Sequence, residues 1–277
     1  MRIVRFTPGP DAGLGQDPLF GVLEDDATIS IISGDPIYSG IQKTAAKIEL
    51  NKVRLLAPII PRSKVVCVGK NYADHAAEMG GVVPEEPIIF LKPNTSVIGP
   101  NDTIVWPDMS ERIDHEAELA IVIGRICKDV PLERVNDVIF GYTIANDVTA
   151  RDIQKKDGQW TRAKGFDTFC PIGPWIDTDF IPGTQRITAK VNEDQKQDAR
   201  LNQMIFGIPE IVQFVSQVMT LLPGDVILTG TPAGIGPLQP QGTVTVAIES
   251  RSMHPLYKKV VSKTKKFKAF LCIQQLN

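Results

Sequence analysis

Residues 113–124, with the sequence IDHEAELAIVIG, carry two glutamates into an apolar run. Successive side chains of a β-strand point to opposite faces, so Glu116 and Glu118 share one face. Ala120 and Val122 continue that face, and the intervening positions are leucine and isoleucine. Apolar residues on both faces predict a strand that is buried on both sides. Because unpaired buried charge is very unfavourable, the chain must fold so that something compensates these two carboxylates.

Arginines, protons or a divalent cation could compensate the pair. Hard cations such as Mg²⁺ take oxygen ligands, and Asp147, in GYTIANDVTARD, is a candidate third carboxylate at a strand-to-helix junction. The spacing fits equally well with ion pairs between the glutamates and Arg112 or Arg125. In that alternative, Asp147 is only the N-cap of a helix that begins near Thr149.

His75 and Glu78, in YADHAAE, are three residues apart and would share one face of a short helix. A carboxylate that orients an imidazole raises its basicity and fixes its tautomer, as a general base requires. The loop at 80–87, GGVVPEEP, follows directly and has the composition of a mobile lid. A solvated surface pair is the alternative interpretation of this spacing.

Further polar groups occur in three segments. Arg151 and Gln154, in ARDIQ, share a helical face, and Lys164 lies in RAKGFD. Arginine grips carboxylates, and lysine supplies a point charge for an enolate, although surface charge explains each residue alone. The glycine-rich LTGTPAGIG at 228–236 lacks the spacing of nucleotide-binding loops and offers Thr231 and backbone amides to a carboxylate.

Composition limits the partners and the location. The net charge of −2 creates no global field for nucleic acid or anionic lipid. No segment approaches the ~20 apolar residues of a membrane span, and the N-terminus lacks the apolar region of a signal peptide. Four scattered cysteines favour reduced thiols. We therefore expect a cytoplasmic protein that binds neither nucleic acid nor membranes.

Many short strands and few helices predict an α+β fold dominated by mixed sheet. Residues 1–57 are expected to form a small β-rich N-terminal domain, and residues 58–277 a larger domain that contains all the candidate site residues. Within the latter, the amphipathic segment 208–225 predicts a helix. The tail at 250–277 is atypical, with six lysines between 258 and 268.

Six ordered motifs resemble the fumarylacetoacetate hydrolase superfamily, over roughly residues 58–248. They are VGKNYADHAAEM, PIIFLKP, DHEAELAIVIG, NDVTARDIQ, TRAKGFDTFCPIGPWI and ILTGTPAGIG. They are most similar to the branch of acylpyruvate hydrolases, oxaloacetate decarboxylases and hydroxyheptadienedioate isomerases. The resemblance implies mixed sheets rolled into a sandwich or barrel, preceded by a small N-terminal domain, and a homodimer.

The resemblance also assigns roles to the candidate residues, and it favours the metal over the ion pairs. It implies that Mg²⁺ or Mn²⁺ is bound by a set of three ligands: Glu116, Glu118 and Asp147. It implies a catalytic role for a lid dyad and a lysine: His75, Glu78 and Lys164. It implies substrate binding by three further residues: Arg151, Gln154 and Thr231.

The resemblance predicts a metal-dependent enzyme that acts on a small 2-oxo acid through a metal-stabilised enolate. Hydrolysis of acylpyruvates, decarboxylation of oxaloacetate, or both are expected. The alternatives are a 2-hydroxyhepta-2,4-diene-1,7-dioate isomerase and a catalytically inactive 2-oxo acid binding protein. The three reactions share one enolate, so the motifs do not choose among them. The tail departs from the family pattern of a glycine-containing turn and a last strand, which puts the closing strand in question.

Overall fold

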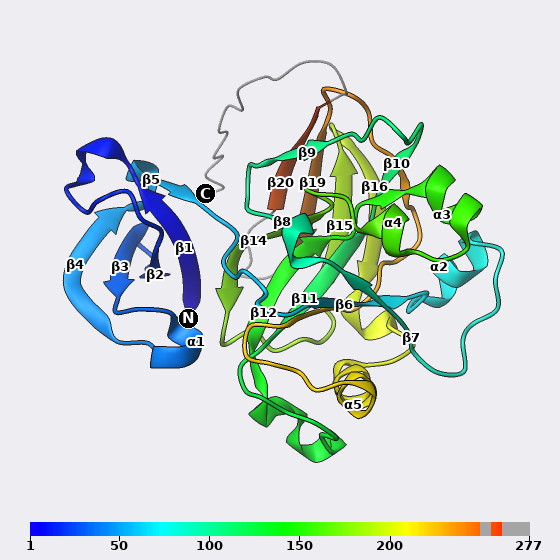
Figure 1. Cartoon of the computed structure of the whole chain (residues 1–277), viewed down its shortest axis with the longest axis horizontal. Helices are drawn as coiled ribbons and strands as arrows, with labels where there is room; N and C mark the ends of the chain where they lie inside the picture. The colour runs from blue at the N-terminus through cyan, green and yellow to red at the C-terminus, as the bar shows by residue number, and fades with distance from the viewer. Residues whose placement is uncertain (250–255, 262–277) are drawn as a thin grey trace.

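The computed structural model describes residues 1–249 and 256–261. Its largest element is an open, mixed sheet of twelve strands (Figure 1). Ten strands follow one another in the order β4 (Lys43–Glu49), β3 (Thr28–Ile32), β2 (Leu19–Leu23), β1 (Arg2–Pro8), β14 (Cys170–Asp177), β12 (Ile139–Asn146), β11 (Ala117–Ile123), β17 (Val226–Leu228), β6 (Val65–Gly69) and β7 (Ile88–Lys92). Two more strands join from the side, β5 (Val53–Leu55) on β1 and β8 (Val97–Ile98) on β14.

A second sheet packs against the first and makes the architecture a sandwich. Its five strands are β16 (Asp194–Arg200), β15 (Arg186–Val191), β19 (Thr243–Ile248), β20 (Leu256–Val261) and β9 (Thr103–Val105). A smaller sheet contains β13 (Thr149–Ala150), β10 (Ile113–His115) and β18 (Gly236–Pro237). Because the large sheet ends at β4 and β7, it does not close into a barrel. The predicted mixed-sheet α+β fold is confirmed in its sandwich form.

Short helices connect the strands. The α-helices are α1 (Pro36–Ser39), α2 (Ala73–Glu78), α3 (Arg151–Asp157), α4 (Thr161–Lys164) and α5 (Ile208–Val218), and the 3-10 turns are η1 (Pro10–Ala12), η2 (Leu50–Lys52), η3 (Asn94–Ser96), η4 (Leu132–Asp137) and η5 (Leu201–Gln203). The helix predicted over 208–225 ends at Val218, which is seven residues earlier than expected. The reason is tertiary, because Leu221 leaves the helix to pair with Cys127. No helix in residues 1–249 or 256–261 is long and apolar enough to cross a membrane.

Strand β11 is buried along its whole length, as its sequence predicts. Leu119, Ile121 and Ile123 belong to the core cluster between the two sheets and α5. Ala120 and Val122 belong to a second cluster on the opposite face, with residues of β6 and β17. Burial of each leucine or isoleucine contributes about 1.5–3 kcal/mol, so β11 is a firmly held base for the glutamates at its start.

The N-terminal strands share the large sheet with the rest of the chain. Antiparallel pairing of β1 with β14 places Arg2 opposite Asp177 and Ile3 opposite Ile176. Figure 1 shows the N-terminal unit on one side of the molecule, with α2, α3 and α4 on the other. The predicted domain boundary at residue 57 falls between β5, which pairs with β1, and β6.

The parallel pair β6 and β17 brings the segments that follow these two strands to the same end of the sheet. Cys67 is opposite Leu228, and both strands run toward that end of the sheet. The residues that follow β6 therefore lie beside the glycine-rich loop that follows β17.

The atypical tail still supplies a closing strand. Strand β20 pairs antiparallel with β19 and parallel with β9, which settles the question raised by the missing glycine turn. Two of the six lysines between 258 and 268 fall in β20, and the others lie outside the described residues. Segments 250–255 and 262–277 of the predicted atypical tail also lie outside them.

Candidate metal centre

Three carboxylates meet where β11 begins and β12 ends. Glu116 directly precedes β11, Glu118 is its second residue, and Asp147 directly follows β12. The backbone N–H of Asp147 donates to the Glu116 carbonyl over 2.9 Å, which joins the two strand ends. One oxygen from each carboxylate lies within 4.8 Å of the other two. The structure therefore brings together the three predicted metal ligands, hereafter the carboxylate triad, all buried.

Glu116 has two cationic neighbours. Lys164 Nζ donates to Glu116 Oε2 over 2.6 Å, and Arg151 Nη2 donates to Glu116 Oε1 over 2.5 Å. Burial alone would raise the pKa of Glu116, but Lys164 and Arg151 outweigh it and hold that pKa well below its usual range. Glu116 is therefore ionised.

The ion-pair alternative proposed from the sequence is correct that Glu116 is ion-paired, but the partners are Arg151 and Lys164 and not Arg112 or Arg125. Arg112 makes a two-pronged contact with Asp114 and not with either glutamate of the triad. Helix α3 begins at Arg151 with Ala150 as its N-cap residue, and no side chain caps it. Asp147 is therefore not the helix cap, and its carboxylate lies beside those of Glu116 and Glu118.

Glu118 has a different environment. Its Oε2 accepts a hydrogen bond of 2.6 Å from the Gly230 N–H. Burial, followed by the negative charges of Asp147 and Glu116, raises the pKa of Glu118 well above its usual range. Among the described residues, no cationic side chain forms an ion pair with Glu118, whereas Glu116 and Asp147 each have two such partners. A hard divalent cation supplies positive charge and favours an all-oxygen donor set, so these residues fit one.

Lys92 is a buried lysine to which the sequence analysis gave no role. It is the last residue of β7, it is 1% exposed, and its Nζ donates to Asp147 Oδ1 over 2.6 Å. Lys164 Nζ donates to the other oxygen, Asp147 Oδ2, also over 2.6 Å. Asp147 is thus held from both sides. In the sequence, only the position of Lys92 at the end of the apolar run PIIFLKP indicates that this lysine could be buried.

Arg151 is fixed by three partners. Besides Glu116, its Nε donates to Asp114 Oδ2 over 3.0 Å and its Nη1 donates to Gln154 Oε1 over 2.6 Å. Because Oε1 of Gln154 faces Arg151, the amide Nε2 keeps its two N–H donors for another group. Asp114, also without a role in the sequence analysis, positions Arg151.

Thr231 is held by Gln197, a residue the sequence analysis did not single out. Gln197 is fully buried on β16, and its Nε2 donates to Thr231 Oγ1 and to the Pro232 carbonyl, both over 2.8 Å. Its Oε1 accepts from the Ala117 N–H over 2.9 Å. Since Thr231 Oγ1 accepts from Gln197, its own hydroxyl proton is available to a ligand.

His75 and Glu78 form the predicted contact on α2. His75 Nδ1 lies 3.3 Å from Glu78 Oε2, and His75 is only 5% exposed. Both oxygens of Glu78 accept from the Gly234 N–H over 3.2 Å, so the glycine-rich loop fixes the carboxylate. The imidazole is buried whereas Glu78 is exposed, so the solvated surface pair considered from the sequence describes only the carboxylate.

These side chains surround a single cavity of about 30 Å³. Eight of the nine predicted residues line it, namely His75, Glu116, Glu118, Asp147, Arg151, Gln154, Lys164 and Thr231. Glu78 contacts it only through His75. Met79, Phe90 and Trp160 add an apolar wall, with the two aromatic rings edge to face at 5.1 Å. The cavity is thus lined by the carboxylate triad, by polar hydrogen-bond donors and by the imidazole of His75.

Two family models together match most of the chain. The model described as fumarylacetoacetate (FAA) hydrolase C-terminal matches residues 64–260. The model described as Rv2993c-like, N-terminal matches residues 1–58.

Curated relatives agree with these models. The chain is 59% identical to protein Rv2993c of Mycobacterium tuberculosis over 219 residues, covering 78% of this chain and 80% of that protein. It is 47% identical to the mitochondrial oxaloacetate tautomerase fahd2 of Xenopus laevis over 265 residues, covering 85% and 81%.

Solved structures share the fold over nearly the whole chain. A 5-carboxymethyl-2-hydroxymuconate delta-isomerase from Mycobacterium smegmatis is 48% identical, with a TM-score of 0.86 and coverage of 95% of this chain and 100% of that one. A maleylpyruvate hydrolase from Sphingobium sp., in complex with manganese (II) ion and pyruvate, is 31% identical, with a TM-score of 0.77 and the same coverage. The chain therefore belongs to the fumarylacetoacetate hydrolase family.

Proposed function

We propose that this chain is a divalent-metal-dependent enzyme that hydrolyses the C3–C4 bond of acylpyruvates through an enolate. The observation that carries the proposal is the meeting of the carboxylate triad and His75 at one cavity. A catalytically inactive binding protein would not need a buried imidazole oriented by a carboxylate beside that triad. Such a dyad is the arrangement expected of a general base.

The triad would hold Mg²⁺ or Mn²⁺. When bound, the cation supplies a Lewis acid for the carboxylate and the 2-keto oxygen of the substrate. A relative of known structure, the maleylpyruvate hydrolase, contains manganese and pyruvate, which supports this assignment.

His75 is the proposed base. Glu78 faces Nδ1, so Nε2 is the nitrogen left to take a proton from water. Water attacks the C4 carbonyl, the C3–C4 bond breaks, and its electron pair passes to C3 as an enolate. The proton held on His75 then returns to C3, giving pyruvate and a carboxylic acid.

The other polar residues have positioning roles in this proposal. Lys164, with its pKa raised by Asp147 and Glu116 against the opposing effect of burial, stays charged and stabilises negative charge in the cavity. Gln154 Nε2 and the Thr231 hydroxyl would donate to substrate oxygens. Arg151, already committed to three partners, mainly holds Glu116 and Gln154 in place.

The small cavity also bears on how a substrate enters. A volume of about 30 Å³ has room for an ion or for one or two waters, but not for a four-carbon acid. Binding therefore requires part of the wall to move. The predicted lid at 80–87 directly follows α2 and is mostly exposed, with Val82 at 88%, so it is the proposed moving part.

Enolisation of oxaloacetate is the second candidate function. The 47% identity to an oxaloacetate tautomerase favours it, and it needs only a proton donor and acceptor near C3. Decarboxylation of oxaloacetate and isomerisation of a hydroxydienedioate pass through a related enolate. None of these reactions needs an attacking water.

A substrate panel with and without Mg²⁺ tests the proposal. Acetylpyruvate, oxaloacetate and 2-hydroxyhepta-2,4-diene-1,7-dioate should be followed for pyruvate release, loss of CO₂, enol content and dienol absorbance. Metal-dependent cleavage of acetylpyruvate supports the proposed hydrolase. Enol exchange of oxaloacetate without cleavage would replace it with the second candidate, and no reaction of any acid would refute both. Light scattering at micromolar concentration tests the predicted homodimer separately.

A further inference from the structure

Lys70 lines the cavity from the side of α2, and the mechanism above does not use it. It directly follows β6, at the end of the sheet where the loop after β17 also begins. The two segments are in close contact, because a Cβ on Gly230 would lie 2.6 Å from Asn71 Cβ. Lys70 and Thr231 therefore enter the cavity wall from adjacent segments.

The Lys70 ammonium has no carboxylate partner. Lys92 and Lys164, the other lysines near the triad, each contact Asp147 over 2.6 Å. Within residues 1–249 and 256–261, by contrast, no hydrogen bond or ion pair to Lys70 Nζ is present, and the side chain is only partly buried. A cation placed in a cavity wall without an anion is available to an anionic ligand.

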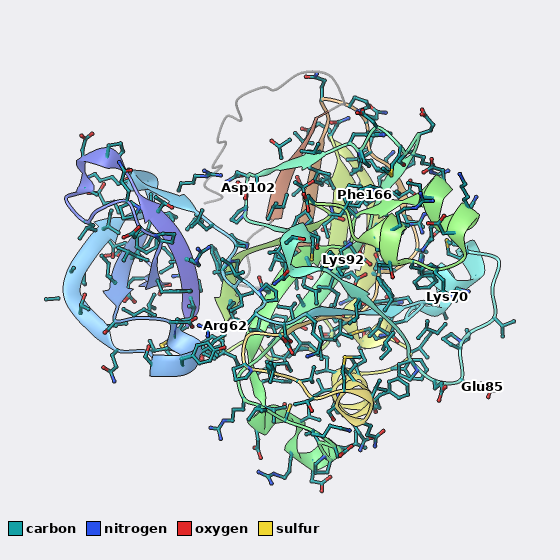
Figure 2. The ribbon with its side chains drawn as sticks, in the orientation of Figure 1. Arg62, Lys70, Glu85, Lys92, Asp102 and Phe166 are labelled. Carbon is teal, nitrogen blue, oxygen red and sulfur yellow. The ribbon has the colours of Figure 1, made fainter. Side chains whose placement is uncertain are left out.

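The predicted lid lies against this ammonium. A Cβ on Gly81 would lie 2.7 Å from Lys70 Nζ and 3.6 Å from its Cε, so only a glycine leaves the lysine where it is. Figure 2 shows Lys70 beside α2 and Glu85 farther out on the loop that follows. A ligand group held by Lys70 would therefore be under the lid.

The backbone of Lys70 is also strained. Its φ is +56°, a left-handed conformation that is uncommon and unfavourable for a residue other than glycine. Such strain persists where the surrounding structure imposes it, and it is concentrated at functional sites. Here it accompanies the placement of a long cationic side chain in the cavity wall.

The net charge of the groups around the cavity indicates which class of ligand it would bind. The carboxylate triad contacts three cationic side chains, those of Lys92, Arg151 and Lys164. Asp114, which also contacts Arg151, is paired with Arg112, so these charges balance. A divalent cation and Lys70 would leave the cavity positive. The enolate of a 2-oxo monocarboxylate offsets the divalent cation alone, whereas a second carboxylate also offsets Lys70.

We propose that Lys70 is a specificity-determining residue that binds the distal carboxylate of 2-oxo dicarboxylic acids. This inference rests on the proposed function, because it assumes that a 2-oxo acid occupies the cavity. The competing explanation is a lid latch, in which Lys70 pairs with Glu85 or Glu86 whenever the loop moves.

Two five-carbon acids that differ only in the terminal carboxylate test the inference: 2-oxoglutarate and 2-oxopentanoate. Their binding is measured by calorimetry in saturating Mg²⁺. A charge-assisted hydrogen bond should make the wild-type protein prefer 2-oxoglutarate by about 10-fold or more. Lys70→Met should abolish this preference and leave the affinity for 2-oxopentanoate nearly unchanged.

Further variants make the result specific. Lys70→Arg should keep most of the preference, and Lys156→Met, on the exposed face of α3, should keep all of it. If Lys70→Met does not fold, Lys70→Gly replaces it, because glycine accepts the positive φ.

Three results would contradict the inference in distinguishable ways. A wild-type protein that binds both acids equally would overturn the role of Lys70 and leave the proposed function standing. Equal weakening of both acids by Lys70→Met would indicate the lid latch instead. A wild-type protein that binds neither acid would refute the proposed function, and the inference with it.

Discussion

The side-chain amide of Gln197 donates to Thr231 Oγ1 over 2.8 Å, and this contact joins the second sheet to the cavity. The same amide group also contacts the Ala117 N–H and the Pro232 carbonyl. One buried glutamine therefore sets the start of β11, the glycine-rich loop and the direction of the Thr231 hydroxyl.

Replacing Gln197 should be costly. Gln197→Leu leaves the Ala117 N–H and the Pro232 carbonyl buried without their partner, and each unsatisfied group costs about 1–3 kcal/mol. The free energy of unfolding, measured by urea titration, should fall by about 2–4 kcal/mol. Gln195→Leu, on an exposed position of the same strand, should change it by less than about 0.5 kcal/mol. Equal effects at the two positions would show that the contacts of Gln197 contribute nothing.

Glu118→Gln should weaken the binding of Mg²⁺ by more than about 10-fold, because a neutral carbonyl oxygen replaces an anionic ligand. Calorimetry measures the affinity directly. At 100 times the dissociation constant, Mg²⁺ should stabilise the wild-type protein by about 2.7 kcal/mol, and this gain should shrink in the variant. Glu193→Gln, on an exposed turn, is the control. Unchanged Mg²⁺ affinity in Glu118→Gln would remove Glu118 from the site.

Lys92→Met should lower the stability of the metal-free protein and strengthen the binding of Mg²⁺. Removing one partner of a buried ion pair costs about 3–5 kcal/mol, so the metal-free variant should unfold at lower temperature. The carboxylate triad also becomes more negative, so Mg²⁺ should bind more tightly and restore part of the lost stability. Thermal unfolding with and without Mg²⁺ tests both effects. A variant with normal stability and weaker Mg²⁺ binding would contradict this account of Lys92.

His75→Ala should lower the turnover of an acylpyruvate by roughly 10²–10⁴-fold, the usual effect of losing a positioned base. Binding of Mg²⁺ should survive, because the triad is formed at the start of β11 and the end of β12 and not on α2. Glu78→Ala should be nearly as damaging, and the double variant should be little worse than either, since groups that act as a unit are not additive. Near-normal hydrolysis by His75→Ala would place the base elsewhere. Reactions that need no attacking water should tolerate this change better.

Much of the site was predictable because its signals are local. The alternation in residues 113–124 predicts the burial of β11 and the shared face of Glu116 and Glu118, and the structure has both. The i,i+3 spacing of His75 and Glu78 predicts their contact in the same way. Such patterns survive folding because the geometry of a strand or of one helical turn imposes them.

The remainder depends on which distant segments meet. Strand β16 has the sequence DQKQDAR, which contains no apolar alternation, and pairing with β15 makes it a strand. The polar side chain of Gln197 therefore gave no sign of being buried. Lys70 and Lys92 stand in recognisable motifs, but the sequence does not tell which carboxylate a lysine meets across the sheet.

Because β1 pairs with the end of β14, the N-terminal module (residues 1–57) covers part of that strand. Strand β8 pairs with the start of β14, and β1 pairs with its end, at Ile176 and Asp177. Without residues 1–57, the end of β14 would be an exposed edge, with unpaired backbone groups ready to recruit a strand from another molecule. The module thus covers the end of β14 and moves the open edge of the sheet to its own strand β4. Any domain exchanged for it would have to provide a strand that covers β14 in the same register.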